Sequence, residues 1–382
     1  MSAADGPVSA ADGAVSTEVE QLVDLSRAAG GDLLLVQGGG GNASVKSADG
    51  ARMWIKASGF RLADVRPDRG HVTTDVAALL ASVRDPSLAA LPRAQAHEAS
   101  VERVQAAARD GGRFRPSLET GFHAVLPRVV LHTHAVLVNA FTCMEGGERA
   151  LAGALGDTVP IVAYEPPGYA LAVAVDRAWR ARRADAQLIA LANHGLIAVG
   201  ATPAEALAAT RRAVAAAESF FGALEPDACA EGAPPPALVE WAARLTGRAA
   251  VVRPAKFAAL LDAATTPDRW LRAGPLVPDD VVYSGRQVAL ADEHGTPGGR
   301  PIAPVIAVAG LGVVLTGASA AAVDATEETL LAHVLVRRLI ARRGRPRALP
   351  AHEVDYLVAM ESEHYRSAIA AGAVPGSGPC RS

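Results

Sequence analysis

The sequence predicts an α/β fold in two parts, and three observations support this prediction. Short apolar runs rich in β-branched residues alternate with longer segments whose apolar residues recur every three or four positions, as in strands between amphipathic helices. Residues 225–236 read EPDACAEGAPPP, which is the composition of a linker. The 382 residues suffice for two domains, so we expect a larger unit at residues 17–224 and an α/β extension at residues 237–370.

The composition excludes several classes of protein. A net charge of −3 gives no electrostatic footprint for nucleic acid, and no apolar run approaches the ~20 residues that span a bilayer. Cys143, Cys229 and Cys380 have no CxxC spacing, which fits a reducing cytosol better than a disulfide scaffold. Residues 1–16 lack the pattern of a signal peptide, and we expect them and residues 371–382 to be disordered tails. We therefore expect a cytoplasmic protein that binds neither nucleic acid nor membranes.

The N-terminal unit opens with a helix, a strand and a glycine-rich loop. Ser16–Ala29 has a serine cap and an amphipathic pattern, and Leu33–Val36 predicts a short strand. The strand leads into QGGGGNASVK, Gln37–Lys46, whose four glycines allow backbone N–H groups to turn toward an anion. The run is neither GxGxxG nor a Walker A motif, so it does not favour nucleotide binding. By itself it leaves an ordinary loop and a phosphate site equally open.

A second strand, Met53–Lys56, favours the phosphate site. It ends at Ala57-Ser58-Gly59, where a hydroxyl and a flexible backbone can close round the same anion. Two Gly/Ser turns at the ends of paired strands therefore predict a phosphate-binding pocket. Helices are expected to follow at Thr73–Arg84 and Glu98–Asp110.

The stretch Pro116–His134 brings one carboxylate and three histidines together in PSLETGFHAVLPRVVLHTH. Val129–Phe141 predicts a buried strand, in which His132 and His134 project from one face. Ser117 is suited to cap a short helix that places Glu119 and His123 one turn apart. A buried histidine is usually a core residue, but a pair on one face beside an acid predicts a metal site, since zinc takes imidazole and carboxylate ligands. His123 lies outside the pair and is interpreted as structural.

The rest of the N-terminal unit adds a third imidazole. A strand at Val159–Ala163 leads to the rigid turn YEPPGY, which begins at Tyr164 and can expose a phenol. Two apolar strands between residues 187 and 199 are broken by Asn193-His194-Gly195, so His194 becomes the candidate third ligand. The sequence further predicts these helices and strands: Leu171–Arg183, a helix capped by Thr202 that ends near Phe221, Ala237–Leu245, segments near Lys256–Ala264, a strand pair in Pro304–Thr316, Ala320–Arg342 and His352–Ser367.

Five motifs in order, GGGGNASVK, WIKASG, PSLETGFH, HTH and NHGLIAVG, resemble the class II aldolase/adducin family over about residues 17–222. Fuculose- and rhamnulose-1-phosphate aldolases are the sugar-cleaving members of that family. The resemblance implies an α/β/α sandwich with a central, mainly antiparallel sheet. With its extension, the chain is also similar to the aldolase half of two-domain rhamnulose-phosphate aldolase/lactaldehyde dehydrogenases. It stops before a dehydrogenase, so we expect no nicotinamide chemistry.

The resemblance also implies roles for individual residues. It makes Zn²⁺ or another divalent metal the expected cofactor, with the ligands Glu119, His132, His134 and His194. Glu119 would ligate the resting metal and act as the base when substrate arrives. Tyr164 would be a proton donor across a subunit boundary, which implies a homo-oligomer such as a tetramer. The residues that match the phosphate site are Gly41, Asn42, Ser58, Gly59 and Ser117. Leu118 stands where that site often has a second hydroxyl residue.

The expected function is that of a lyase in carbohydrate metabolism. The resemblance implies reversible cleavage of a ketose 1-phosphate, or a similar hydroxy-keto sugar derivative, to dihydroxyacetone phosphate and an aldehyde through a metal-bound enediolate. Epimerases of the family carry Asp where aldolases carry Glu, so Glu119 favours cleavage. Two alternatives stay open: an epimerase or decarboxylase on the same metal site, and a non-catalytic adducin-like interaction module.

Overall fold

The computed structural model describes residues 16–360, apart from 112, 157, 226, 246, 248, 264–270, 272 and 296–302. The predicted tail at residues 371–382 lies outside the described residues, and so does the tail at 1–16 except for Ser16. The end of the helix predicted at His352–Ser367 also lies outside them.

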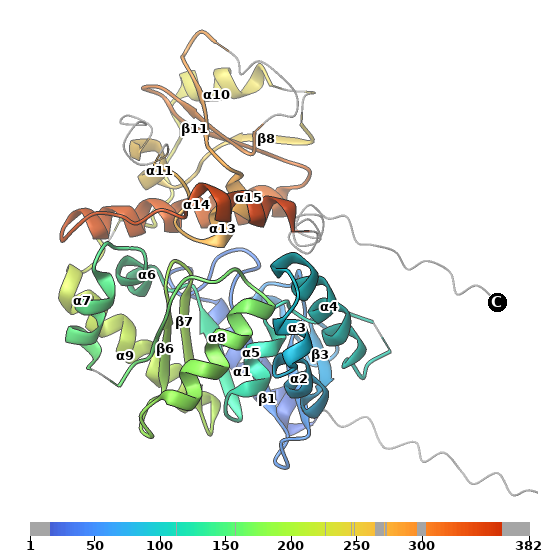
Figure 1. Cartoon of the computed structure of the whole chain (residues 1–382). Helices are drawn as coiled ribbons and strands as arrows, with labels where there is room; N and C mark the ends of the chain where they lie inside the picture. The colour runs from blue at the N-terminus through green and yellow to red at the C-terminus, as the bar shows by residue number, and fades with distance from the viewer. Residues whose placement is uncertain are drawn as a thin grey trace, which may run out of the picture.

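The N-terminal unit is built on one seven-stranded sheet (Figure 1). The strands run in the order β3-β2-β1-β4-β7-β6-β5, and neighbours are antiparallel except for β5 and β6. The central, mainly antiparallel sheet is therefore confirmed. Its strands are β1 Asn42–Lys46, β2 Arg52–Lys56, β3 His71–Asp75, β4 Val129–Thr133, β5 Ile161–Val162, β6 Leu188–Leu191 and β7 Gly195–Gly200.

Helices cover both faces of this sheet because successive strand residues point to opposite sides. In β4, Val129 and Leu131 join the apolar cluster that includes α1 and α9, whereas Val130 joins the cluster that includes α5 and α8. This alternation gives the α/β/α sandwich. The helices of the unit are α1 Thr17–Gly30, α2 Val76–Val83, α3 Pro86–Ala89, α4 Arg93–Ala106, α5 Thr120–Val125, α6 Val136–Thr142, α7 Gly147–Leu155, α8 Tyr169–Ala181 and α9 Pro203–Phe221, with a 3-10 turn at Leu62–Asp64.

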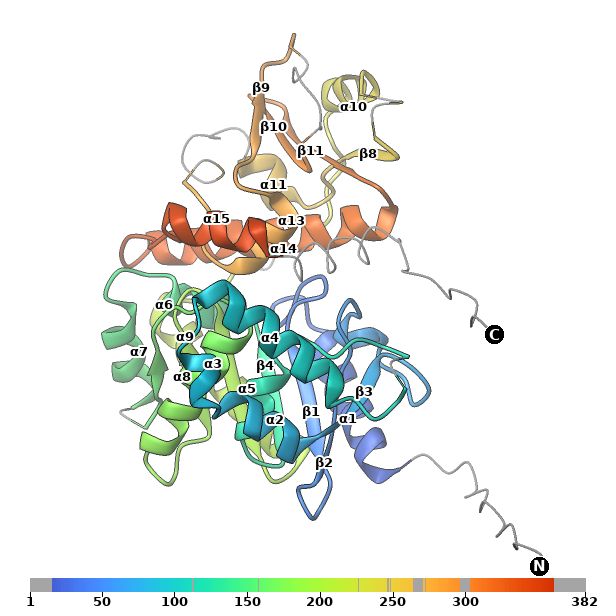
Figure 2. The ribbon, with the colours of Figure 1, turned by 45° about the vertical axis from the view of Figure 1, so that its right-hand side comes forward.

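The extension has a smaller sheet of its own, with strand order β8-β11-β10-β9. Figures 1 and 2 both show helices α13, α14 and α15 lying between this sheet and the N-terminal unit. The elements are α10 Pro236–Ala243, β8 Val251–Pro254, α11 Ala258–Ala263, α13 Pro278–Ser284, β9 Ala289–Ala291, β10 Val305–Val308, β11 Gly312–Gly317, α14 Ala320–Ala341 and α15 Ala351–Ala359.

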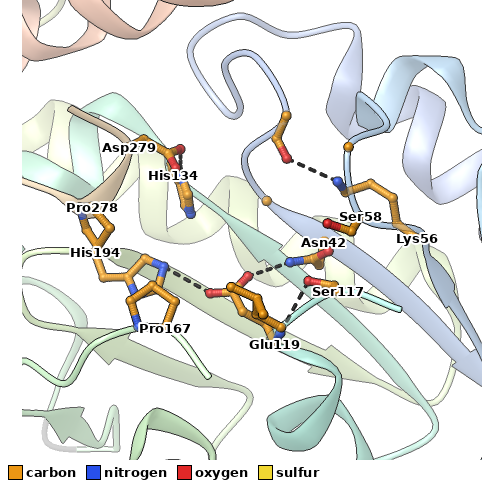
Figure 3. Close-up of a pocket in the computed structure, with 14 residues that line it drawn as sticks. Asn42, Lys56, Ser58, Ser117, Glu119, His134, Pro167, His194, Pro278 and Asp279 are labelled. Carbon is orange, nitrogen blue, oxygen red and sulfur yellow. Dashed lines mark hydrogen bonds and ion pairs between the residues drawn. The ribbon is translucent and has the colours of Figure 1, made fainter. Parts of the chain in front are cut away.

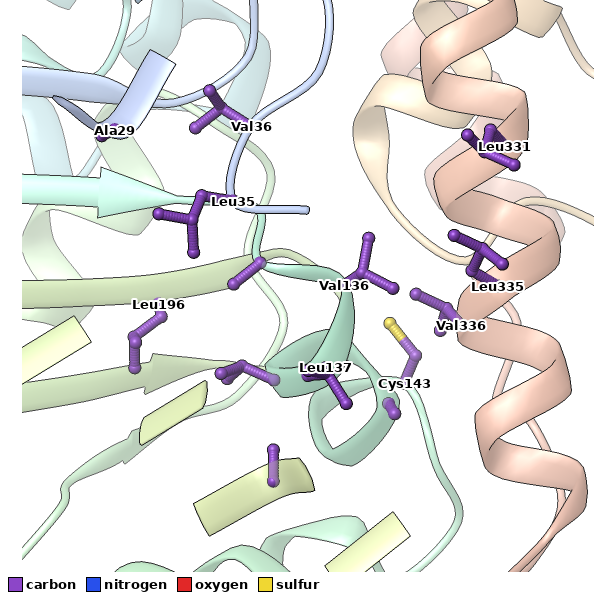
Figure 4. Packing of buried hydrophobic residues seen from close by; sticks show 14 of the residues in the cluster. Ala29, Leu35, Val36, Val136, Leu137, Cys143, Leu196, Leu331, Leu335 and Val336 are labelled. Carbon is purple, nitrogen blue, oxygen red and sulfur yellow. The ribbon is translucent and has the colours of Figure 1, made fainter. Parts of the chain in front are cut away.

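The long helix α14 joins the two units through a shared apolar core. Its Leu331, Leu335 and Val336 lie beside Val136 and Cys143, which belong to α6 or follow it directly (Figure 4). One continuous cluster of buried residues includes side chains of both units. The extension therefore packs directly on the N-terminal unit, and it does so close to the end of β4 that carries the histidines.

Two strand predictions were wrong. The strand expected at Val129–Phe141 ends at Thr133, and α6 follows from Val136. Every residue of α6 is buried, and a short, mostly apolar buried helix cannot be distinguished from a buried strand by periodicity, even though Asn139 interrupts the apolar run. The segment Leu33–Val36 is a turn, because Asp32 Oδ1 accepts from the backbone N–H of Leu34 and the Asp32 carbonyl accepts from the next two N–H groups.

Three predicted helix starts were also wrong. The helix expected at Glu98–Asp110 spans Arg93–Ala106. The helix expected at Thr73–Arg84 begins only at Val76, because Asp75 caps it by accepting from the N–H of Ala78, and the threonines before it belong to β3. The helix expected to start at Ser117 begins at Thr120, with Glu119 at the capping position. The Ser117 hydroxyl instead accepts from the N–H of Glu119 at 3.3 Å, which fixes the backbone just before the helix.

Candidate active site

Three histidines meet at one end of the central sheet. His132 is in β4, His134 directly follows that strand, and His194 lies in the turn between β6 and β7, which pairs with β4. All three are buried, and one ring nitrogen from each lies within 4.8 Å of the others. The structure therefore brings together the three imidazoles that the sequence predicted from two separate motifs.

The turn that carries His194 can approach His132 and His134 because Gly195 has no side chain. A Cβ at that position would lie 2.4 Å from the Thr133 carbonyl oxygen and 3.2 Å from each of the two rings. Asn193 takes a left-handed conformation, with φ at 51°, and donates from Nδ2 to the carbonyls of Leu276 and Arg347. The Asn-His-Gly sequence is thus explained by the shape of this turn.

The hydrogen bonds of the rings leave Nε2 available as the donor atom. His132 Nδ1 lies 3.0 Å from the Leu196 carbonyl oxygen, and His134 Nδ1 lies 2.6 Å from Asp279 Oδ2. Both oxygens only accept, so Nδ1 carries the proton and Nε2 presents a lone pair. The two Nε2 atoms are 3.0 Å apart, a distance at which two lone pairs repel unless a cation lies between them. This arrangement fits a divalent metal ion.

Burial favours the protonation state that such an ion requires. It lowers the pKa of His132 to about 3, because the charged ring would lose its hydration. The ring is then neutral at neutral pH, which is the form that binds metals.

Glu119 supplies a carboxylate to the same centre. Its Oε1 lies 3.1 Å from His194 Nε2 and 3.7 Å from His132 Nε2, while Oε2 accepts from Asn42 Nδ2 at 2.5 Å (Figure 3). Burial alone would raise the pKa of Glu119, but positive charge on the neighbouring rings of His132 and His194 would outweigh it and hold the pKa well below its ordinary value. Three imidazoles and one carboxylate are a donor set typical of zinc and similar ions.

A cavity with about 410 Å³ of empty space, including its open mouth, lies over Glu119 (Figure 3). All five residues predicted for phosphate binding line it, together with His134, His194 and Glu119. The complete lining is Gly39, Gly41, Asn42, Lys56, Ser58, Gly59, Ser117, Leu118, Glu119, His134, Pro167, His194, Pro278 and Asp279. Three of the four predicted metal ligands and all the predicted phosphate residues therefore face one space, whereas His132 is not part of this lining.

Much of the glycine run is occupied by protein groups. The N–H of Gly38 donates to Glu328 Oε2 at 2.9 Å, that of Gly39 to the Tyr283 hydroxyl at 2.9 Å, and that of Gly40 to the Gln37 carbonyl at 2.9 Å. These three N–H groups do not turn toward the cavity as the sequence suggested. The Asn42 side chain also differs from expectation, since its amide holds Glu119.

Tyr164 lies outside this cavity. It packs against an apolar cluster of the extension that includes Val281, Leu349 and Leu357, and it is absent from the cavity lining formed by the described residues. Its predicted role crosses a subunit boundary and concerns an assembly, so it stays a prediction.

Two cavity residues were missed by sequence reasoning. Lys56, inside the WIKASG motif, is buried and donates from Nζ to the carbonyls of Phe60 at 2.7 Å and Gly39 at 3.1 Å. The motif was a usable signal, but a lysine in a strand is usually taken as an exposed residue. Asp279 comes from the extension, and an aspartate in the first turn of a helix is ordinarily explained by the helix dipole.

His123 has a structural role, as its position outside the histidine pair suggested. Its Nδ1 lies 2.8 Å from the Ser44 hydroxyl oxygen, and its ring stacks on Phe122. Lys46 of the GGGGNASVK motif is nearby and donates from Nζ to the carbonyls of His123, Leu126 and Pro127, which closes the end of α5. His123 and Lys46 therefore hold α5 against β1 through these hydrogen bonds.

Among the residues that the structure describes, no helix combines the length and the apolarity needed to cross a membrane.

The N-terminal unit is similar to a known protein family. A sequence model of the family described as "Class II Aldolase and Adducin N-terminal domain" matches residues 20–220. An uncharacterized oxidoreductase of Bacillus subtilis (strain 168), YuxG, is 28% identical over 213 residues, which are 53% of this chain and 29% of that protein. The chain thus spans less than a third of the length of this relative.

Two solved structures resemble the N-terminal unit. One is the N-terminal class II aldolase domain of a conserved protein from Thermoplasma acidophilum, with 28% identity and a TM-score of 0.47, covering 55% of this chain and 97% of that one. The other is YgbL from Klebsiella pneumoniae, described as a putative aldolase/epimerase/decarboxylase, with 20% identity and a TM-score of 0.40, covering 55% of this chain and 91% of that one.

Proposed function

Because the chain belongs to the class II aldolase and adducin family, we propose that it is a divalent-metal-dependent aldolase. The proposed reaction is the reversible cleavage of a ketose 1-phosphate, or a related hydroxy-keto sugar derivative, into dihydroxyacetone phosphate and an aldehyde. The observation that carries the proposal is the buried group of three imidazoles, two of which contact the Glu119 carboxylate, beside a cavity that Glu119, His134 and His194 line.

The residues of the site fit a metal ion that takes part in this chemistry. His132, His134, His194 and Glu119 would hold a divalent ion such as Zn²⁺, which would act as a Lewis acid toward the ketone oxygen of the substrate. Because the three imidazoles are neutral ligands, they leave the positive charge of the ion undiminished.

Glu119 is proposed to move the proton at the carbon of the donor half. In the cleavage direction, the hydroxyl on the aldehyde side loses its proton, the adjacent carbon–carbon bond breaks, and its electron pair stays with the donor half. The aldehyde leaves, and Glu119, a carboxylate at rest, takes up the proton that the hydroxyl lost and delivers it to the donor carbon; in synthesis it removes that proton. Tyr164 of a neighbouring subunit is proposed to exchange the hydroxyl proton. Asn42 orients the Glu119 carboxylate through Oε2, so that Oε1 faces the histidines.

The phosphate group is proposed to lie on the side of the cavity away from the extension. Ser58 and Ser117 provide hydroxyls there, and Gly41 and Gly59 provide close backbone. Lys56 adds a positive charge at the same wall, where burial strengthens its attraction for an anion. This lysine supports a phosphorylated substrate although Leu118 replaces a second hydroxyl residue.

The test combines metal analysis with product analysis. The purified protein is assayed for bound metal and for retro-aldol cleavage of a panel of deoxyketose 1-phosphates, with dihydroxyacetone phosphate measured by a coupled reduction. We expect activity that disappears on chelation, returns with a divalent metal and is lost in Glu119→Ala. Activity that survives both chelation and Glu119→Ala would rule out the proposed mechanism.

The same assay separates the alternatives. An epimerase on this site would convert the sugar phosphate without releasing an aldehyde, and a decarboxylase would release carbon dioxide. A protein that binds no divalent metal would favour an adducin-like interaction module.

We also propose that the enzyme is a cytoplasmic homo-oligomer, such as a tetramer. The support is Tyr164, whose proposed role requires a second subunit. Light scattering on the purified protein tests this, and a monomer with full activity would exclude the role across a boundary.

A further inference from the structure

We propose that the extension is part of the metal centre and that Asp279 is a positioning residue for the metal ligand His134. This inference rests on the proposed function only in that the three histidines bind a divalent metal. It concerns a residue outside the matched family region, which ends at residue 220. Asp279 would determine how tightly the ion is held, and it would do so from the first turn of α13.

The contact is direct and buried. Asp279 Oδ2 lies 2.6 Å from His134 Nδ1, and the two side chains are only 4% and 6% exposed. A carboxylate that accepts from Nδ1–H fixes the ring orientation and the tautomer, and it makes Nε2 a stronger donor to a metal. His134 Nε2 is the atom that faces His132 Nε2 at 3.0 Å. Asp279 therefore acts on the donor atom through the opposite edge of the same ring.

The three histidines differ in this respect. His132 is oriented by the neutral carbonyl of Leu196, and His194 Nδ1 has no hydrogen-bond partner among the described residues. Of the three rings, only that of His134 has its Nδ1 held by a charged group within the described part of the chain. Removal of Asp279 should therefore weaken metal binding although every ligand remains.

Gly40 leaves the space that this pair occupies. A Cβ at Gly40 would lie 2.5 Å from Asp279 Oδ2 and 2.8 Å from His134 Nδ1. Gly40 does not have a positive φ, so close atoms, which also include the Gln37 carbonyl oxygen at 3.0 Å, are what oppose a side chain here. The third glycine of the run is thus explained by the Asp279–His134 pair, which links the N-terminal loop motif to the extension.

Further contacts fix α13 against the N-terminal unit. Tyr283 accepts from the N–H of Gly39, and Glu328 of α14 accepts from the N–H of Gly38 while forming an ion pair with Arg61 at 2.6 Å. The shared core under α14 (Figure 4) lies next to these contacts. Asp279 is therefore held in place and does not merely happen to lie near the ring.

The experiment measures metal affinity, not catalysis. Co²⁺ and Zn²⁺ are titrated into the metal-free full-length protein in competition with a chelating dye, and the visible spectrum of the Co²⁺ form is recorded. We expect Asp279→Ala to weaken binding about 10- to 100-fold and to change the Co²⁺ spectrum. Asp279→Asn, which can still accept through its amide oxygen, should give a smaller loss.

The next residue provides a matched control. Asp280 also accepts from a buried histidine, His333, at 2.8 Å, and it caps α13 by accepting from the N–H groups of Leu276 and Val277. Asp280→Asn should disturb the extension at least as much as Asp279→Asn and leave metal affinity unchanged. A second pair needs no change in α13: Gly40→Ala should weaken metal binding, whereas Gly153→Ala, which meets no atom within 4 Å, should not.

Each outcome decides a separate point. A wild-type protein that binds no divalent metal overturns this inference together with the proposed function. Metal affinity in Asp279→Ala equal to the wild-type value, or an equal loss in Asp280→Asn, overturns the inference and leaves the aldolase proposal intact. A loss of metal affinity in Asp279→Ala and Gly40→Ala, but not in the control variants, supports the inference even if no aldolase substrate is found.

Discussion

The two units of the molecule contribute to the cavity in different ways. The N-terminal unit supplies the groups that would touch metal and substrate, namely three imidazoles, a carboxylate and two hydroxyls. The extension supplies groups that hold them: Asp279 on the His134 ring, and Tyr283 on the glycine loop. Reactive groups and the contacts that support them can therefore lie in separate parts of a sequence, although the two units share one hydrophobic core.

The largest expected effect is on kcat, and it should differ between two buried glutamates, one in each unit. Glu119 faces the imidazoles, whereas Glu327 of α14 accepts from Arg253 at 2.7 Å and from the N–H of Lys256 at 2.5 Å. Glu119→Gln should lower kcat about 10²- to 10⁴-fold, because it removes the proposed general base. Glu327→Gln should keep kcat and lower the free energy of unfolding by about 1.5–3 kcal/mol, because it weakens hydrogen bonds to a charged group.

Steady-state kinetics and urea unfolding on both variants check this prediction, with bound metal measured in each. If Glu327→Gln lost activity as severely as Glu119→Gln at unchanged metal content, the division between reacting and supporting units would be wrong.

The reacting unit was largely predictable from the sequence. His132, His134 and His194 were identified from spacing and from strand position, because short motifs record which side chains a sheet must bring together. The family resemblance then gave the mainly antiparallel sheet, which is confirmed. The helix α6 was missed because its short, mostly apolar sequence carries no period that distinguishes it from a strand.

The supporting contacts were not predictable, for a physical reason. Asp279 and His134 are 145 positions apart, and neither the glycine run nor the first turn of α13 shows that the two will meet. A turn fixed by one side chain, such as that of Asp32, was missed for a similar reason, since a local hydrogen bond overrode an apolar run. Sequence patterns reveal faces and periods, whereas contacts between distant loops depend on the assembled fold.

The second prediction tests whether the shared core makes one cooperative structure. Leu335 of α14 is 1% exposed and packs in the cluster that spans both units. Leu335→Ala should lower the free energy of unfolding by about 2–5 kcal/mol, because it leaves a cavity in that core. Val239→Ala, at a residue 46% exposed, should change it by less than about 0.5 kcal/mol. Calorimetry should show a single transition that shifts as a whole. Two transitions, with only one of them moved by Leu335→Ala, would mean that the units unfold separately.

The third prediction concerns the effect of metal removal on Tm. It compares a variant of a metal ligand in the N-terminal unit with a variant of the extension. An ion that binds only the folded state should stabilise it by about 2.7 kcal/mol at a concentration of 100 times its Kd. We expect chelation to lower the Tm of the wild type and to leave the Tm of His194→Ala unchanged, since that variant lacks one imidazole. In Asp280→Asn, the metal should raise the Tm as much as in the wild type, because Asp280 hydrogen-bonds His333 and not a metal ligand. If the metal still raised the Tm of His194→Ala, the metal would have to bind elsewhere.

The smallest expected effect compares two helix caps, one in each unit. The Thr202 hydroxyl accepts from the N–H of Glu205 at the start of α9, and the Ser319 hydroxyl accepts from the N–H of Ala322 at the start of α14. Replacing either by alanine should cost about 0.5–2 kcal/mol, because one N–H of the first turn loses its acceptor. Since α9 and α14 contribute to the same buried cluster, both variants should lower one common unfolding transition by similar amounts. Urea unfolding followed by tryptophan fluorescence and by circular dichroism measures this. If Ser319→Ala moved only a minor early transition while Thr202→Ala moved the main one, the extension would open on its own, and its hold on the metal centre would then depend on that local equilibrium.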